Sequence, residues 1–88
     1  MLFGEVFYPD FMFVLPNCRM IVIWEHFGMM DDPEYLRKAM YKFDAYSRAG
    51  WVLGKNFFFT YETEATPFTF FDARMKLEQI LELDRTGW

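Results

Sequence analysis

Residues 9–25 read PDFMFVLPNCRMIVIWE, two apolar runs on either side of a turn-prone tetrapeptide at residues 16–19. Such a pattern predicts an antiparallel β-hairpin. A two-residue loop and a symmetric four-residue loop give the same register, which places Asp10 opposite Glu25. Directly opposed side chains share a sheet face with Cβ atoms roughly 5 Å apart, and like charges so placed repel each other. A divalent cation between the two carboxylates is the natural solution.

The residues after the hairpin carry the signals of a helix. Asp31 or Asp32 can cap its N-terminus, Pro33 suits its first turn, and Gly50 is a C-terminal stop that ends the helix near residue 49. The expected apolar stripe recurs at helical spacing and consists of Leu36, Ala39, Met40, Phe43 and Tyr46.

A third strand and a second helix complete the pattern. Residues 56–62 form a short apolar run, and the order strand, helix, strand predicts a right-handed crossover that sets this run parallel to residues 20–26. Thr69 and Asp72 have the spacing of a capping box, and the tail at residues 84–88 is expected to fray. The apolar stripe predicted for this last helix consists of Phe71, Met75, Leu77, Ile80 and Leu81.

Both hairpin strands are apolar on both faces, so the sheet must be covered twice. The predicted fold class is therefore α/β, with three α/β/α layers, a mixed sheet made of an antiparallel hairpin plus a parallel strand, and helices on both faces. With 88 residues, 53 % of them hydrophobic and 23 % aromatic, the chain is one small domain and far too apolar for disorder.

The charge and cysteine content narrow the function classes. A net charge of −4 argues against binding nucleic acid by bulk electrostatics, although a local basic stripe remains in the first helix. That stripe consists of Arg37, Lys38, Lys42 and Arg48. No apolar run reaches the length of a membrane span, and the lone Cys18 agrees with a reducing compartment, so a cytoplasmic location without membrane contact is expected.

Two segments carry a resemblance to a known family. Tyr8-Pro9-Asp10-Phe11 and the run from Trp24 to Tyr35 resemble a bacterial branch of the PD-(D/E)XK nuclease superfamily, related to domains similar to very short patch repair endonucleases. The resemblance implies a restriction-endonuclease-like core that hydrolyses DNA phosphodiester bonds. It also implies that Asp10, Glu25 and the backbone carbonyl of His26 hold Mg²⁺, with Mn²⁺ as an alternative.

The chain departs from that family in two places. Phe27 stands where the family has a lysine, and Lys42 from the following helix is our candidate for the replacement, with Lys38 behind it. Only residues 1–7 precede the motif, so we expect residues 1–88 to be an incomplete domain whose open sheet edge is covered by other domains or a partner chain.

Each candidate site residue can also be explained by a role in the fold alone, without catalysis or metal binding. Asp10 can be a strand-entry acid, and Glu25 can pair with an arginine. His26 alternates to the opposite sheet face and is better explained as a half-buried, hydrogen-bonded histidine than as a base. Glu62 suits a solvated strand end better than a site. The alternative function is therefore a catalytically inactive member of the same fold that binds DNA or another protein.

Overall fold

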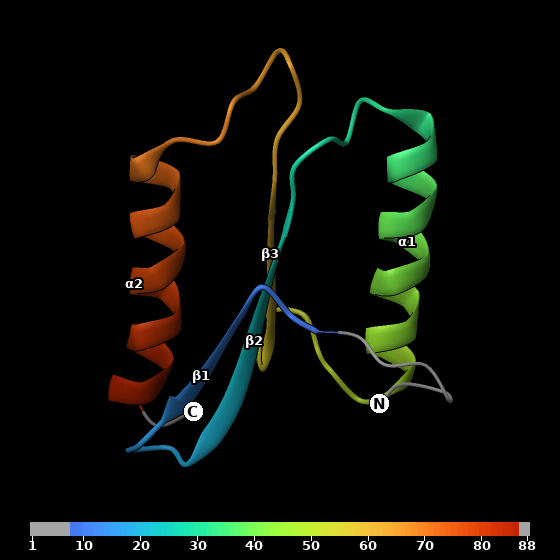
Figure 1. Ribbon diagram of the computed structural model, residues 1–88. Helices are drawn as coiled ribbons and strands as arrows, with labels where there is room; N and C mark the ends of the chain where they lie inside the picture. Colours follow the sequence, from blue (N-terminus) through green and yellow to red (C-terminus); the bar gives the residue numbers. More distant parts are fainter. Residues whose placement is uncertain (1–7, 87–88) are drawn as a thin grey trace.

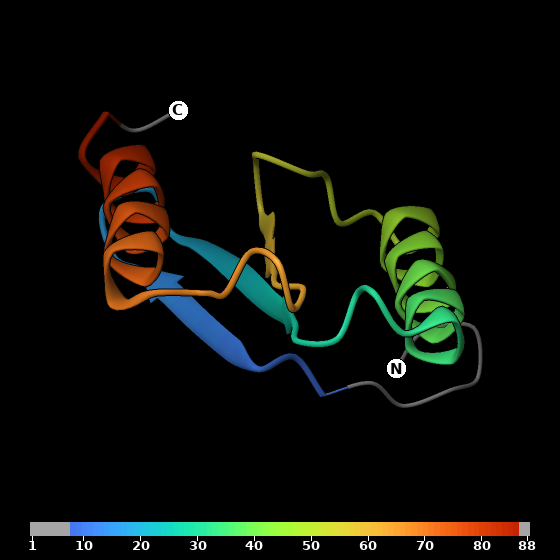
Figure 2. The same ribbon diagram turned by 90° about the horizontal axis from the view of Figure 1, so that it is seen from above.

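The computed structural model describes residues 8–86, which form a three-stranded sheet between two helices (Figure 1). The elements in chain order are β1 (Phe11–Leu15), β2 (Met20–Phe27), α1 (Pro33–Arg48), β3 (Phe57–Tyr61) and α2 (Phe70–Thr86). The strand order is β1-β2-β3, with β1 antiparallel and β3 parallel to β2. Helices α1 and α2 lie on opposite sides of the sheet (Figure 2). The α/β class, the mixed sheet and the two helical layers are therefore confirmed, whereas residues 1–7, on which the expected N-terminal truncation rests, lie outside the described residues.

The hairpin has the predicted register. Phe11 pairs with Trp24 at one end, and Leu15 pairs with Met20 at the other, beside the turn. The loop is the symmetric four-residue version, and Arg19 closes it with a φ of 56°, in the left-handed region. Asp10 directly precedes the first of these pairs, at the end of the sheet where β2 finishes.

Of the tail at residues 84–88 that is expected to fray, residues 84–86 are helical because α2 continues to Thr86, and residues 87 and 88 lie outside the described residues. Asp84 is buried against the hairpin turn. Its Oδ1 accepts hydrogen bonds from the backbone amides of Asn17 (2.8 Å) and Cys18 (2.9 Å), and its Oδ2 accepts one from the Asn17 side chain (3.1 Å). The carboxylate thus satisfies donors of the turn that the strands leave unpaired, and it fastens α2 to the hairpin.

Helix α1 begins and ends as predicted, but a different face points inward. The Asp32 side chain accepts from the amides of the first turn, and Gly50 follows the helix end with a φ of 99°. Ala39 and Tyr46 are buried, whereas Leu36 and Met40 of the expected stripe are largely exposed. The inward face is rotated toward Lys42, because Lys42 and Tyr46 both reach Glu25 in the sheet.

The capping box of α2 is confirmed, and the predicted apolar stripe is wrong. Thr69 donates its amide to Asp72 Oδ2 (3.0 Å), and Asp72 returns its amide to Thr69 Oγ1 (3.2 Å). Of the stripe only Ile80 is buried, and Phe71 is 66 % exposed. The positions turned toward the sheet are Ala73, Lys76, Ile80, Leu83 and Asp84. This face includes Asp84 because the helix docks through that carboxylate on the turn.

The core is divided by the sheet into two clusters. On the α1 side Ile23 and Phe57 pack against Ala45 and Tyr46, and on the α2 side Ile80 packs against a cluster that consists of Leu15, Val22, Trp24 and Phe58. Neither helix in residues 8–86 combines the length and the apolar character needed to cross a bilayer.

Double coverage of the sheet is incomplete at the hairpin. Met12 and Val14 are 59 % and 71 % exposed, and the neighbouring Ile21 is also exposed. These three side chains share the α1 face of the sheet, since they alternate with Phe11, Phe13 and Val22. Coverage of this edge by another domain or a partner chain stays a prediction.

Candidate functional site

Glu25 is the centre of a buried ionic cluster between β2 and α1. The residue is 1 % exposed. Lys42 Nζ lies 2.9 Å from Glu25 Oε1 and 3.0 Å from Oε2. The Tyr46 hydroxyl donates to Oε1 at 2.9 Å. Lys42 and Tyr46 are four residues apart, so they stand one above the other on the same face of α1.

Burial and these contacts act in opposite directions on Glu25. Burial raises the pKa of the Glu25 carboxyl above its ordinary value, because a carboxylate loses hydration there, and the hydrogen bonds from Lys42 and Tyr46 offset part of the rise. The charge of Asp10 adds to the increase. Burial and the adjacent Glu25 raise the pKa of the Tyr46 hydroxyl. The phenol therefore stays a hydrogen-bond donor to Glu25 at neutral pH.

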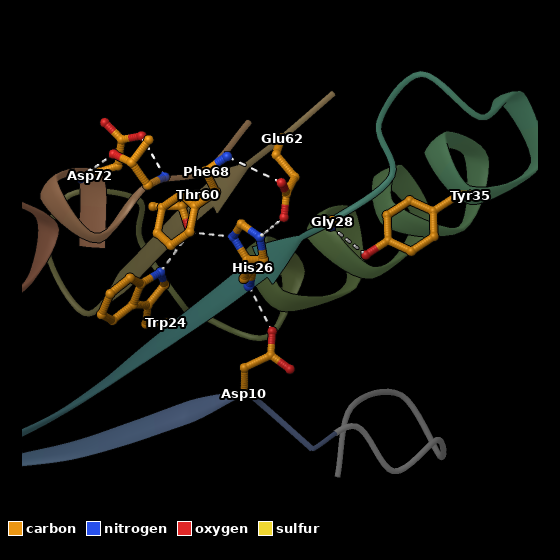
Figure 3. Close-up of polar contacts among 10 residues, drawn as sticks. Asp10, Trp24, His26, Gly28, Tyr35, Thr60, Glu62, Phe68 and Asp72 are labelled. Carbon is orange, nitrogen blue, oxygen red and sulfur yellow. Dashed lines mark hydrogen bonds and ion pairs between the residues drawn. The ribbon is translucent and has the colours of Figure 1, made fainter. Parts of the chain in front are cut away.

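Asp10 faces the same cavity as Glu25. Asp10 Oδ2 accepts the backbone amide of His26 at 2.7 Å, which anchors the carboxylate beside the end of β2 (Figure 3). We call the shared space the carboxylate cavity. It has a volume of about 210 Å³ and is lined by Asp10, Glu25, His26, Phe27, Tyr35, Lys38, Ala39 and Lys42. Two acids and two lysines from three segments of the chain thus surround one small space.

The His26 side chain lies on the opposite face of the sheet, as predicted. Its Nε2 is 3.0 Å from Glu62 Oε1, and its Nδ1 is 2.8 Å from Thr60 Oγ1 (Figure 3). Trp24 Nε1, which can only donate, lies 2.9 Å from the same threonine oxygen. In the neutral ring Nε2 carries the proton and donates to Glu62, and Nδ1 accepts from the Thr60 hydroxyl. Both ring nitrogens are engaged, so His26 is a hydrogen-bonded structural histidine.

Glu62 belongs to this histidine network and does not reach the carboxylate cavity. It accepts from His26 and from the backbone amide of Phe68 at 3.1 Å. The hydrogen bond from His26, followed by that from Phe68, lowers the pKa of the Glu62 carboxyl. The expected solvated strand end is thus a half-buried acceptor that joins β2 to the loop before α2.

The residues around the carboxylate cavity fit a hard divalent cation. Magnesium prefers oxygen ligands, and each ionised carboxylate offers about four lone-pair sites. Within the described chain, Asp10 Oδ1 has no hydrogen-bond donor, and the three contacts of Glu25 leave it acceptor capacity. The carbonyl of Phe27 accepts from Glu62 on the β3 side, so the carbonyl of His26, one residue earlier, points to the side of Asp10.

The sequence-predicted residues are therefore partly brought together. Asp10, Glu25, Lys42 and Lys38 line one cavity, while Phe27, expected to stand at a lysine position, is buried beside Phe59. Tyr46 belongs to the core as predicted, but sequence reasoning missed the hydrogen bond from its hydroxyl to Glu25. Its spacing of four residues from Lys42 was the signal that could have found it.

Comparisons with known proteins assign no family to this arrangement. No family model matches the chain, and neither the curated proteins nor the solved structures contain a match. Across residues 8–86, no group of three or more His, Cys, Asp or Glu side chains is placed to hold a metal ion. The site described above has two carboxylates and a backbone carbonyl, which is a smaller donor set.

Proposed function

We propose that this chain is a metal-dependent nuclease-like domain with a restriction-endonuclease-like core that hydrolyses DNA phosphodiester bonds at the carboxylate cavity. The observation that carries the proposal is the convergence of Asp10, Glu25 and Lys42 on one small space. Asp10 directly precedes β1, Glu25 lies on β2 and Lys42 on α1, so the hairpin register and the packing of α1 together bring them to this space. A cytoplasmic location goes with this proposal, since DNA is the substrate and the only cysteine is unpaired.

Each residue has a distinct role in the proposed reaction. Asp10, Glu25 and the His26 carbonyl would hold Mg²⁺ or Mn²⁺. The chemistry that such an ion supplies when bound is a lower pKa for a coordinated water and compensation of charge on the scissile phosphate. Lys42 orients Glu25 through its two short contacts and adds a positive charge toward the cavity. Lys38, one turn earlier on α1, supplies a second cation for the phosphate backbone.

Metal binding is tested by thermal unfolding in a magnesium or manganese titration. A ligand bound only by the folded state stabilises it by about 1.4 kcal/mol at ten times its dissociation constant, which corresponds to roughly 5–10 °C for a domain of this size. We expect this increase for the wild type and none for Asp10→Asn. Asp44→Asn is the matched control, because Asp44 is an exposed α1 carboxylate paired with Arg48.

Hydrolysis is tested by plasmid nicking in magnesium. We expect nicking by the wild type, none by Glu25→Gln, and a large loss for Lys42→Ala. Lys42→Ala protein that folds and nicks at the wild-type rate would remove Lys42 from the catalytic set.

A second candidate is a catalytically inactive member of the same fold that binds DNA or another protein. The observation that favours it is that both oxygens of Glu25 already accept hydrogen bonds from Lys42 and Tyr46. Such a cluster stabilises the interface of β2 with α1 without any metal. No thermal shift at millimolar metal, together with no nicking, would support this candidate over the enzyme.

A further inference from the structure

A second cavity lies on the α2 side of the sheet and shares two lining residues with the carboxylate cavity. It has a volume of about 430 Å³, which falls in the range of small-molecule sites. We call it the aromatic cavity. Its lining residues are Asp10, Phe11, Trp24, His26, Phe68 and Ala73.

Two pairs of rings line this cavity. Phe11 and Trp24 lie 5.0 Å apart between centroids at an interplanar angle of 41°, and His26 and Phe68 lie 4.3 Å apart at 44°. Trp24 and His26 are held by their hydrogen bonds to Thr60. Phe11 is 49 % exposed and Trp24 only 6 %, so Phe11 is the ring of this pair that solvent reaches. The cavity is thus a preformed surface for a flat ring.

Ala73 sets the space opposite the rings. It lies on the sheet-facing side of α2, where the positions further along the helix are larger and fill their part of the interface. A methyl group at this one position leaves the rings of Phe11 and His26 partly exposed, whereas Trp24 beneath them is buried. A larger side chain there would occupy the aromatic cavity without altering any of its ring walls.

Asp10 and His26 line both cavities, so the two spaces lie on either side of the same two residues at the end of the sheet. The base and the phosphate of a nucleotide are joined through a single sugar. We infer that the aromatic cavity takes one unpaired nucleobase next to a phosphate in the carboxylate cavity. This inference rests on the proposed function and specifies its substrate class as single-stranded DNA.

Stacking explains why an unpaired strand is required. A base in a duplex has both faces covered by its neighbours, and taking it out of the stack costs a few kcal/mol. An unpaired base avoids that cost and gains a stacking contact on an aromatic side chain, which every base can make. Affinity for single strands therefore exceeds affinity for duplex of the same sequence, with little dependence on which base is present.

The experiment measures binding without catalysis. Fluorescence anisotropy of a labelled oligothymidylate is recorded with the full 88-residue chain in EDTA, beside a matched duplex and an oligouridylate. We expect single strands to bind more tightly than duplex, and Phe11→Ala to weaken single-strand binding roughly 5- to 100-fold. Tyr41→Ala, on an α1 residue that is 56 % exposed and does not line this cavity, is expected to bind as the wild type. Tighter binding of the DNA strand would support DNA as the substrate, and equal or tighter binding of the oligouridylate would overturn the assignment to DNA.

Ala73→Leu is the second variant, because it fills the cavity and keeps all its rings. We expect it to fold with at least the wild-type melting temperature and to lose single-strand binding. Photocrosslinking of an oligonucleotide with a 5-iodouracil base, mapped by mass spectrometry, is expected to label Phe11, Trp24 or His26. Unchanged binding by both Phe11→Ala and Ala73→Leu, or crosslinks elsewhere only, would overturn the inference.

Failure of this inference can be told apart from failure of the proposed function. The binding assay contains no metal, so it reports on the aromatic cavity whether or not the carboxylate cavity holds an ion. Metal-dependent nicking without tighter binding of single strands would refute the nucleobase site and leave the proposed nuclease function intact. Single-strand binding without any effect of metal on stability or nicking would refute the proposed nuclease function and leave the nucleobase site supported.

Discussion

Replacement of Lys42 by methionine tests the buried cluster on which the proposed site depends. The substitution keeps most of the length of the side chain and removes the charged group that contacts both oxygens of Glu25. Breaking a buried ion pair typically costs 3–5 kcal/mol because the remaining charge is left uncompensated. The Lys42 side chain is 25 % exposed and Tyr46 still donates to Glu25, so we expect about 2–3 kcal/mol at pH 7.

Protonation of Glu25 limits this loss. Protonating a carboxyl whose pKa has the ordinary value of 4.5 costs about 3.4 kcal/mol at pH 7. At pH 5 the same protonation costs only about 0.7 kcal/mol. In Lys42→Met the pKa of folded Glu25 rises further, so the folded state keeps a proton that the unfolded chain releases. The contribution of Glu25 to stability is therefore complete below pH 4.5 and is lost as pH rises through the folded pKa. Destabilisation of about 2–3 kcal/mol at pH 7 should fall to about 1 kcal/mol at pH 5.

Urea unfolding followed by circular dichroism measures this difference, and a loss of this size lowers the melting temperature of a domain of this length by roughly 10–20 °C. Lys38→Met is the matched control, one turn away on the cavity rim, and is expected within about 0.5 kcal/mol of the wild type. In a Glu25→Gln background, Lys42→Met should cost clearly less, because the charge it compensates is gone. A cost that is the same at both pH values, or the same in both backgrounds, would refute the reasoning.

Three further predictions concern the fold around the site. Asp84→Ala should destabilise the protein by about 2–3 kcal/mol in urea, since the backbone amides of Asn17 and Cys18 lose their acceptor, and a loss below about 0.5 kcal/mol would contradict that role. Thr69→Ala should cost about 1 kcal/mol through loss of the capping box with Asp72, read from the thermal midpoint, and an unchanged midpoint would argue against the cap. The pKa of Glu62 is lowered by His26, so its stabilising contribution is present above its ordinary value of 4.5 and is lost as pH falls through the folded pKa. In Glu62→Gln the urea midpoint should fall less than in the wild type as the pH is lowered. The same fall in the variant and the wild type would argue against the contact of Glu62 with His26.

The hairpin was predictable because its information is local. Two apolar runs and four turn residues between them determine a register, and Phe11 pairs with Trp24 as that register requires. Helix ends were predictable for the same reason, since the caps at Asp32 and Thr69 depend on residues three or fewer positions away. The juxtaposition of Asp10 with Glu25 at one end of the sheet follows from this local pattern.

The packing faces of both helices were not predictable from apolar spacing. Apolar residues lie on several faces of α2, so more than one apolar stripe fits helical periodicity. The contact of Asp84 with the hairpin turn determines which face packs against the sheet. On α1 the selection is made by Lys42 and Tyr46, which turn toward a carboxylate on β2. In both helices a polar contact with a distant element determines the inward face.

By itself, the sequence determined the elements, their order, the hairpin register and the sheet face that each strand residue occupies, because a chain's periodicity and its turn residues act over a few positions. Only the tertiary structure decided that Lys42 and Tyr46 share Glu25, that Asp84 holds the turn, and that His26 is engaged by Thr60 and Glu62. Those contacts join residues that are far apart in the chain. Their existence depends on how whole elements pack, because a buried polar group must find its partner wherever the packed elements place one.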